Sequence, residues 1–493
     1  MKEKNHKILF ALLIVFAIVL HIIFLDYSRF EHEMVRDITI AEKILNGEFV
    51  THGLFGSLKD NAIQQSFGPL YYYFIAFSLI FTNNPYYYSL APYVLTIILN
   101  ILSVVILFLF CKEFFNLRMA FITSSLYLFS PWIFVHVFSI FTNPNFMPPF
   151  IILFIYSMFK FVIKNENKFL IYGMISLVLM TQFHLSSLLL FPVFVFYLFL
   201  KKKFKINYFV YGLLISFTLF LPFLFYNILN NQLGSIFLFL SGRYGSNILK
   251  SAMESFGMPV LYLTPYFGKY LLGNLKFNFL MNIFIIIFTA LMVLLFSFAA
   301  YNFIKLLIKK DTRIKLLMIW IILPIITYTF SSKDISPHYL TILLPSQFIV
   351  LGLYFDKIMN KFKIAKFLPH IVIIANIMFI LLFYNLVNEN DGTSGIFGVP
   401  YKVKYELVGY IKEDSSNTEP IINYYVGNKR ELNFLFGKLG LRPRINIINN
   451  IDDYTEGYLV LDRYSFYSYD KAIDMKKDEQ VPVNVGKFEI YKK

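Results

Sequence analysis

Long apolar runs recur along the chain at a length that soluble folds rarely use. A helix needs about 20 apolar residues to cross a hydrocarbon core of about 30 Å. Hydrophobic residues make up 57% of the 493-residue chain and charged residues only 15%. The sequence therefore predicts an all-α polytopic membrane protein with about 11 transmembrane helices, at 8–25, 86–110, 119–139, 146–163, 169–181, 187–200, 207–229, 279–304, 316–331, 338–355 and 368–388.

The segment 69–82 is apolar, but it is too short to span comfortably. If it lies at the interface, the short segments between alternate spans hold 21 of the 45 Lys and Arg, whereas the loops on the other side are longer in total and hold only 9. Basic residues concentrate on the cytoplasmic side of a membrane. We therefore expect a multi-pass plasma membrane protein with a cytoplasmic N-terminus, an extracytoplasmic C-terminus and interfacial helices in a first outer loop at 26–85.

The net charge, the N-terminal segment and the cysteine content limit the kinds of partner and processing that we expect. The net charge of +15 comes mainly from short clusters between apolar runs, so we expect membrane lipid and no nucleic acid as a partner. A signal peptide is an alternative for the N-terminal run, but no small-residue cleavage site follows it, which favours a retained first span. The single cysteine, Cys111, excludes an intramolecular disulfide.

From about Asn388 the chain changes character. A linker at 390–395 is followed by a predicted helix at 401–413 and by predicted strands at 421–426, 458–462 and 488–491. The expected organisation is a transmembrane domain at 1–388 and a small extracytoplasmic α/β domain at 389–493.

The first outer loop carries the densest charge. Six charged residues and a histidine lie between Asp26 and Asp37. Apolar residues at helical spacing predict a helix on the membrane surface, on which Arg29, Glu33 and Asp37 would share a face. Two carboxylates held there can deprotonate an acceptor or hold a cation. The alternative is a solvated interfacial helix whose charges pair with one another.

Polar residues at the other outer turns are weaker candidates one by one. Ionisable groups at membrane depth are costly, which makes them functional candidates, although a lone interfacial His or Asn is more often a packing or capping residue. An arginine in the long loop 230–278 suits phosphate recognition or anchors a lipid headgroup. The candidates for substrate or lipid-phosphate binding are Asn143, Asn145, His184, Arg243, Lys333, His338 and Tyr339, together with Arg36.

Several chemistries lack their motifs. The sequence has no Walker-type loop, no H-E-x-x-H and no nucleophile elbow. Chemistry driven by cytoplasmic ATP therefore has no recognisable site.

Several short patterns follow one another along the chain. Acids and an arginine lie at 33–37 after the first span, a helical segment follows at 40–48, and a proline-aromatic segment lies at 68–73. Polar turns lie at 142–145, 182–184 and 337–339. Together these patterns resemble the GT-C glycosyltransferases, in particular the protein-mannosyltransferase and aminoarabinose-transferase-like group (glycosyltransferase family 39-like). The segment 33–37 resembles that family's Asp-Glu-x-Arg-like motif, 68–73 is similar to its interfacial helix and the turns are similar to its later outer turns, so the resemblance covers residues 8–388.

The resemblance implies transfer of a sugar, with inversion, from a polyprenyl-phosphate carrier to a lipid, glycan or protein acceptor on the outer face. A carboxylate of the first loop would act as base. Where Arg36 sets the register, Glu33 takes the place of the family's first acid and Met34 replaces the second. Both Asp37 and Glu33 are therefore predicted catalytic residues, with Asp37 ahead because an Arg-Asp pair is similar to a subgroup pattern.

Some alternatives remain open at this point. A lipid or glycan transporter or flippase would show internal repeats and broken helices in matching halves; a non-catalytic scaffold would not need the first-loop carboxylates. The sequence names neither the sugar nor the acceptor nor the carrier length. No cofactor is certain, and two carboxylates are compatible with a divalent metal or with metal-free chemistry.

Overall fold

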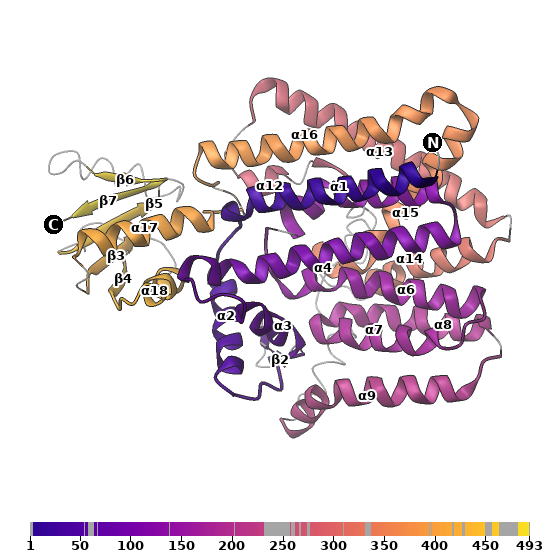
Figure 1. The fold of residues 1–493 in the computed structure, drawn as a ribbon, viewed down its shortest axis with the longest axis horizontal. Coiled ribbons are helices and arrows are strands. Elements are labelled where there is room, and N and C mark those ends of the chain that lie inside the picture. The colour runs from indigo at the N-terminus through magenta and orange to yellow at the C-terminus, as the bar shows by residue number, and fades with distance from the viewer. Residues whose placement is uncertain are drawn as a thin grey trace.

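A computed structural model gives the arrangement of the chain (Figure 1). It describes residues 3–53, 55–57, 64–66, 68–137, 139–201, 203–230, 257, 262–265, 268–273, 277–308, 310–330, 337–393, 395, 397–416, 419–425, 429–448, 456–462 and 482–492.

Each of the predicted apolar segments coincides with a helix, although some are short or continue through a 3₁₀ or π turn. These helices are α1 (Glu3–Ile23), α4 (Pro85–Phe114), α5 (Leu117–Leu128, then a π turn at Trp132–Val137), α6 (Pro148–Ile163), α7 (Phe169–Phe183), α8 (Phe191–Lys201), α9 (Ile206–Leu229), α13 (Phe279–Leu307), α14 (Thr312–Phe330), α15 (Leu344–Lys361) and α16 (Leu368–Glu389). In the described part of the chain, six helices are long and apolar enough to cross a membrane. The chain is thus a mostly helical membrane protein, and eleven spans with the stated orientation stay a prediction.

The first outer loop contains two helices, as expected. Helix α2 (His32–Leu45) is followed by a short hairpin of β1 (Phe55–Ser57) and β2 (Gln64–Ser66) and by α3 (Leu70–Leu79). Helix α3, with its 10 residues, rises about 15 Å, half of a hydrocarbon core. A length of this kind agrees with the prediction that the segment 69–82 does not cross.

The C-terminal part forms a five-stranded mixed sheet in the order β4-β3-β5-β7-β6. The predicted helix and three predicted strands are present as α17 (Tyr401–Asp414), β3 (Ile421–Tyr425), β5 (Tyr458–Asp462) and β7 (Phe488–Lys492), and the sequence did not predict α18 (Lys429–Lys438), β4 (Arg444–Ile448) or β6 (Val483–Val485). Strand β3 pairs in parallel with β4 and β5, whereas β7 is antiparallel to β5 and β6. Helices α17 and α18 contact each other, and Leu407 of α17 and Leu435 of α18 belong to the same extensive buried cluster as Ile422, Val460 and Ile490 of the sheet. The exact boundary at residue 388 stays a prediction.

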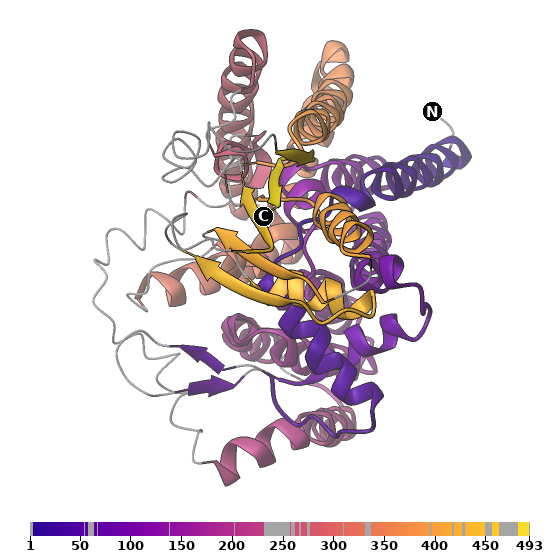
Figure 2. The ribbon, with the colours of Figure 1, turned by 90° about the vertical axis from the view of Figure 1, so that its left-hand side faces the viewer.

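The elements of the first outer loop and the C-terminal sheet lie at the same end of the helix bundle, and the N-terminus lies at the other end (Figure 1). Seen from the end that carries the sheet, the sheet stands in front of the bundle and next to α2 (Figure 2). The expectation that these two regions share one side is therefore met by the fold.

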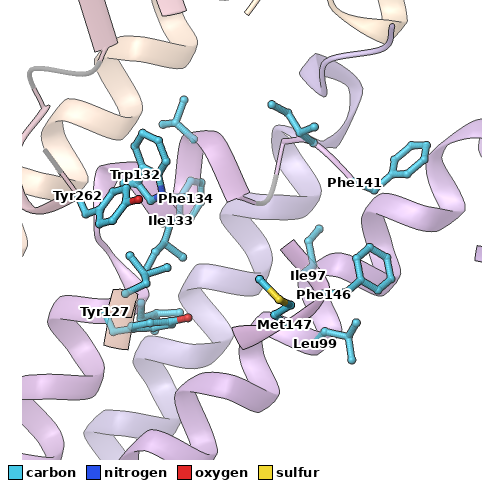
Figure 3. Packing of buried hydrophobic residues seen from close by; sticks show 14 of the residues in the cluster. Ile97, Leu99, Tyr127, Trp132, Ile133, Phe134, Phe141, Phe146, Met147 and Tyr262 are labelled. Carbon is cyan, nitrogen blue, oxygen red and sulfur yellow. The ribbon is translucent and has the colours of Figure 1, made fainter. Parts of the chain in front are cut away.

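Close helix contacts and large aromatic rings fix the bundle. A Cβ added at Gly352 of α15 would lie 1.9 Å from Oγ1 of Thr123 on α5, so glycine lets the two helices cross closely without displacing this side chain. Beyond α5, Trp132 lies against Tyr262 with ring centroids 4.7 Å apart (Figure 3). This packing positions the turns at the bundle end that carries α2.

Candidate functional site

Helix α2 forms because its sequence supplies both a start signal and a buried stripe. Glu31 is the N-cap in a capping-box arrangement, and Gly47 follows the helix with a φ of +90°. Met34, Val35, Ile38 and Ala41 are buried at helical spacing. The predicted surface helix is thus present, but it begins at His32, so the expectation that Arg29 shares a helical face with Glu33 and Asp37 is wrong. Arg29 lies in the extended segment before the cap, where it pairs with Glu31.

Asp37 is a buried carboxylate with two partners. Its side chain is 3% exposed, whereas that of Arg36 is 35% exposed. Nε of Arg36 donates to Oδ1 of Asp37 over 3.0 Å. The hydroxyl of Tyr71, on α3, lies 3.1 Å from Oδ2 of Asp37 and 3.0 Å from the carbonyl oxygen of Phe141, so its proton is shared between them. Two neighbouring side chains, one of them from a second helix, therefore fix the orientation of this one carboxylate.

Burial raises the pKa of Asp37 from 3.8 to about 6, although Arg36 and the Tyr71 hydroxyl both favour the charged form. Burial together with Asp37 also raises the pKa of the Tyr71 phenol well above its usual range, so Tyr71 remains a donor. A carboxyl with a pKa of about 6 is largely ionised at neutral pH and still accepts a proton readily. This is the electrostatic character expected of a general base.

Glu33, one turn before Asp37, lies in a different environment. It is exposed, and it makes no hydrogen bond or ion pair within the part of the chain that the structure describes. The two candidate carboxylates are thus separated by burial: one is held and dehydrated, the other is solvated.

Aromatic side chains connect Asp37 to the outer turns. The ring of Tyr71 packs edge-on against Phe146, with centroids 5.0 Å apart, and Phe146 lies 6.0 Å from Phe183, the last residue of α7. Figure 3 shows Phe141 and Phe146 at the two ends of the turn that carries Asn143 and Asn145. Asn145 is buried and donates to the carbonyl oxygen of Ile140 over 2.8 Å, so it shapes this turn. Asn143 is half-buried in the same turn.

His184 and Tyr339 also meet at this end. His184 follows α7 and is buried; its Nδ1 lies 2.8 Å from Oγ of Ser186, and its ring centroid lies 5.5 Å from that of Tyr339. The 3₁₀ turn Pro337–Leu343, which carries Tyr339, contacts both the Asn143–Phe146 turn and the turn Leu185–Leu190 after His184. The structure therefore gathers turns from distant parts of the chain.

Three predicted residues receive no structural account. Arg243 and Lys333 lie outside the described residues, and the side chain of His338 does too. In the described part, no three His, Cys, Asp or Glu side chains lie close enough together to hold a metal ion. From the sequence, Tyr71 was included only within the proline-aromatic segment 68–73 and was not paired with Asp37. The signal that could have found this pair was a tyrosine hydroxyl placed just after Gly68-Pro69.

The chain matches one family model and several known folds. Residues 66–226 match the family model described as dolichyl-phosphate-mannose-protein mannosyltransferase. The chain is similar in structure to ArnT from Cupriavidus metallidurans bound to undecaprenyl phosphate, with 10% sequence identity, a TM-score of 0.59 and 97% of each chain covered. The chain has the GT-C fold. The apo form of ArnT gives the same TM-score of 0.59 at 11% identity and 97% coverage of both chains.

The predicted resemblance of the GT-C chain is confirmed at the level of the fold. The Archaeoglobus fulgidus oligosaccharyltransferase in its apo form matches 93% of this chain and 69% of its own, at 14% identity and a TM-score of 0.49. No curated protein sequence matches the chain. The family match begins after α2, so it contains Tyr71, Asn145 and His184 but not Asp37.

Proposed function

We propose that the chain is a membrane glycosyltransferase that moves a sugar from a polyprenyl-phosphate carrier to an acceptor at the bundle end that carries α2. The main support is Asp37: a buried carboxylate with a pKa of about 6, held by Arg36 and Tyr71 beside the gathered outer turns. The family model and the GT-C fold support the donor class, because ArnT was solved with undecaprenyl phosphate bound.

In the proposed reaction, the acceptor atom attacks the anomeric carbon while the bond from that carbon to the phosphate oxygen breaks. Attack from the face opposite the phosphate inverts the anomeric centre. Asp37 takes the acceptor proton, and polyprenyl phosphate leaves with the bonding electrons. Arg36, partly exposed beside Asp37, places positive charge near the developing phosphate. Arg243, Lys333 and His338 remain proposed phosphate partners, as do His184, Tyr339, Asn143 and Asn145 for the substrates.

The test compares the two carboxylates. Purified protein is given radiolabelled polyprenyl-phosphate mannose, glucose and aminoarabinose with an envelope fraction as acceptor source, and release of polyprenyl phosphate is measured. Because general base catalysis contributes about 10²- to 10⁴-fold, Asp37→Asn should lose about that much activity. Glu33→Gln, the matched control one turn away, should lose less than about tenfold.

The pH profile provides a second readout. Activity should fall as the pH drops through about 6, because the base becomes protonated. The folded-state pKa lies above the unfolded value, so the ionised Asp37 destabilises the fold above about pH 6, and this cost disappears at low pH. Loss of activity near pH 6 therefore does not reflect unfolding caused by Asp37. Full activity in both Asp37→Asn and Glu33→Gln would reject the role of this loop, and transport of the intact donor without release of polyprenyl phosphate would favour the flippase alternative.

A further inference from the structure

The C-terminal helices α17 and α18 contact the first outer loop on both sides of Asp37. Helix α17 contacts the segment before α2, and α18 contacts α2 itself (Figure 1). This contact joins opposite ends of the sequence, and neither the family model nor the proposed chemistry accounts for it.

At the start of α2, the key group is the ammonium of Lys404 on α17. Lys404 is 5% exposed; its Nζ forms an ion pair with Glu431 of α18 and donates to the carbonyl oxygen of Phe30, which closely precedes the helix. A buried ammonium costs several kcal/mol unless its partners are well placed. Both of these partners are therefore required at fixed positions, and one of them is the backbone of the first loop.

Backbone and ring contacts reinforce this attachment. The amide of Tyr401 donates to the carbonyl oxygen of Ser28 over 2.9 Å, and Arg29 forms an isolated β-bridge with Pro400. The ring of Phe30 packs edge-on against Tyr401 with centroids 5.2 Å apart. The entry to α2 is thus built partly from the C-terminal region.

Near the other end of α2, Lys438 of α18 forms an ion pair with Glu42. Its Nζ also lies 3.8 Å from the centroid of Tyr88, on α4. This pair is partly exposed, at 25% for Lys438 and 27% for Glu42, so it is weaker than the buried one. Together the two lysines fix α2 on either side of Asp37.

We propose that Lys404 and Lys438 are positioning residues through which the C-terminal region sets the orientation of α2, and with it the carboxylate of Asp37. The inference rests on the proposed function for its catalytic consequence. A misplacement of about 1 Å can cost about 100-fold in rate, so a helix that carries a base needs fixed ends. Neither lysine touches Asp37; each acts through the backbone or the helix.

The test uses the full-length protein and two readouts. In Lys404→Met and Lys438→Met, amides of residues 32–45 should exchange hydrogen faster, by about tenfold or more for Lys404→Met and by less for Lys438→Met. The kcat for release of polyprenyl phosphate should fall about tenfold for Lys404→Met, while KM for the donor changes less than about twofold. Lys402→Met is the matched control. Lys402 lies on the same helix, is 42% exposed, and its Nζ lies 3.9 Å from a carboxylate oxygen of Glu406 and 5.9 Å from the ring centroid of Tyr27. Neither of these weak contacts reaches α2, so both readouts should stay close to the wild type.

Conservative variants separate positioning from general loss of structure. Lys404→Arg keeps a cation that can reach the same acceptors and should recover most of the kcat and the slow exchange. If Lys404→Met fails to fold, Lys438→Met still tests the proposal. Its ion pair with Glu42 is partly exposed, so its loss should leave the protein folded. Unchanged exchange in α2, or a kcat like that of Lys402→Met, would overturn the proposal. If the wild type releases no polyprenyl phosphate, the transferase proposal fails, and the exchange readout alone then decides the attachment of α2.

Discussion

Polar side chains make different kinds of hydrogen bonds within α4 and at the bundle end that carries α2. Within α4, Thr96, Asn100 and Ser103 donate to carbonyl oxygens four residues earlier in the same helix. At the end that carries α2, by contrast, Tyr71 bonds to α2 and to the chain at Phe141.

The difference shows which polar groups carry positional information. A Ser, Thr or Asn that bonds to its own helix satisfies itself wherever that helix lies. A group that bonds across segments requires a particular tertiary arrangement and fixes it. The crossing of α5 and α15 depends instead on the close contact of Gly352 with Thr123.

The largest effect is expected when the crossing of α5 and α15 is disturbed and the cross-segment hydrogen bonds are left in place. Gly352→Ala places a Cβ 1.9 Å from Oγ1 and 3.2 Å from Cβ of Thr123, so Thr123 must rotate and α5 and α15 must shift apart slightly. Overpacking of this kind costs about 1–3 kcal/mol, and the unfolding midpoint in detergent should fall clearly. Gly409→Ala is the matched control: nothing lies within 4 Å of its added Cβ on α17, and the midpoint should hold or rise. Equal midpoints for both variants would contradict a packing role for Gly352.

A smaller effect should follow at the outer end when one cross-segment bond is removed. Tyr71→Phe deletes a donor to the charged form of Asp37, so the pKa of Asp37 should rise above about 6. A hydrogen bond to a charged group contributes about 1.5 kcal/mol or more, which corresponds to about one pH unit. The midpoint of the pH–activity profile should therefore move up by about one unit.

Tyr73→Phe is the control for this shift. Tyr73 lies on the same helix and donates to the carbonyl oxygen of Val50 over 3.1 Å rather than to Asp37. Its pH midpoint should match that of the wild type. A common midpoint for both tyrosine variants would show that Tyr71 does not tune the carboxylate.

The smallest effect is expected inside the bundle. Asn100→Leu removes a bond that lies within α4 and a buried carbonyl oxygen, Oδ1, that has no partner among the described residues. Replacing such a group with an apolar one of similar size is nearly neutral or stabilising. Stability and transfer activity should both stay close to the wild type, within about 1 kcal/mol and about twofold, as measured by the detergent unfolding midpoint and by release of polyprenyl phosphate. A large loss of activity would reveal a function for Asn100 that its hydrogen bonds do not show.

The difference between local and cross-segment interactions explains which elements could be predicted from the sequence. Apolar run length located the long bundle helices of the described residues, and the separation of 69–82 from the spans agrees with the short helix α3. Strand β5 was predicted to the residue, because Tyr458–Asp462 is a compact apolar run. Helix α18 and strand β4 were missed: both are short, and both begin with charged residues that hide their buried positions.

At the candidate site, the sequence determined which carboxylates were available, and the tertiary structure gave the two of them different environments. Spacing placed Glu33 and Asp37 one turn apart and favoured neither strongly. Packing of α3 and the outer turns on α2 buried Asp37, gave it Tyr71 as a partner and raised its pKa to about 6. Hydrophobic periodicity is local and can be seen in a single segment, whereas burial and cross-segment hydrogen bonds depend on which segments meet. The grip of Lys404 and Lys438 on α2 is of the second kind, since its partners come from opposite ends of the sequence.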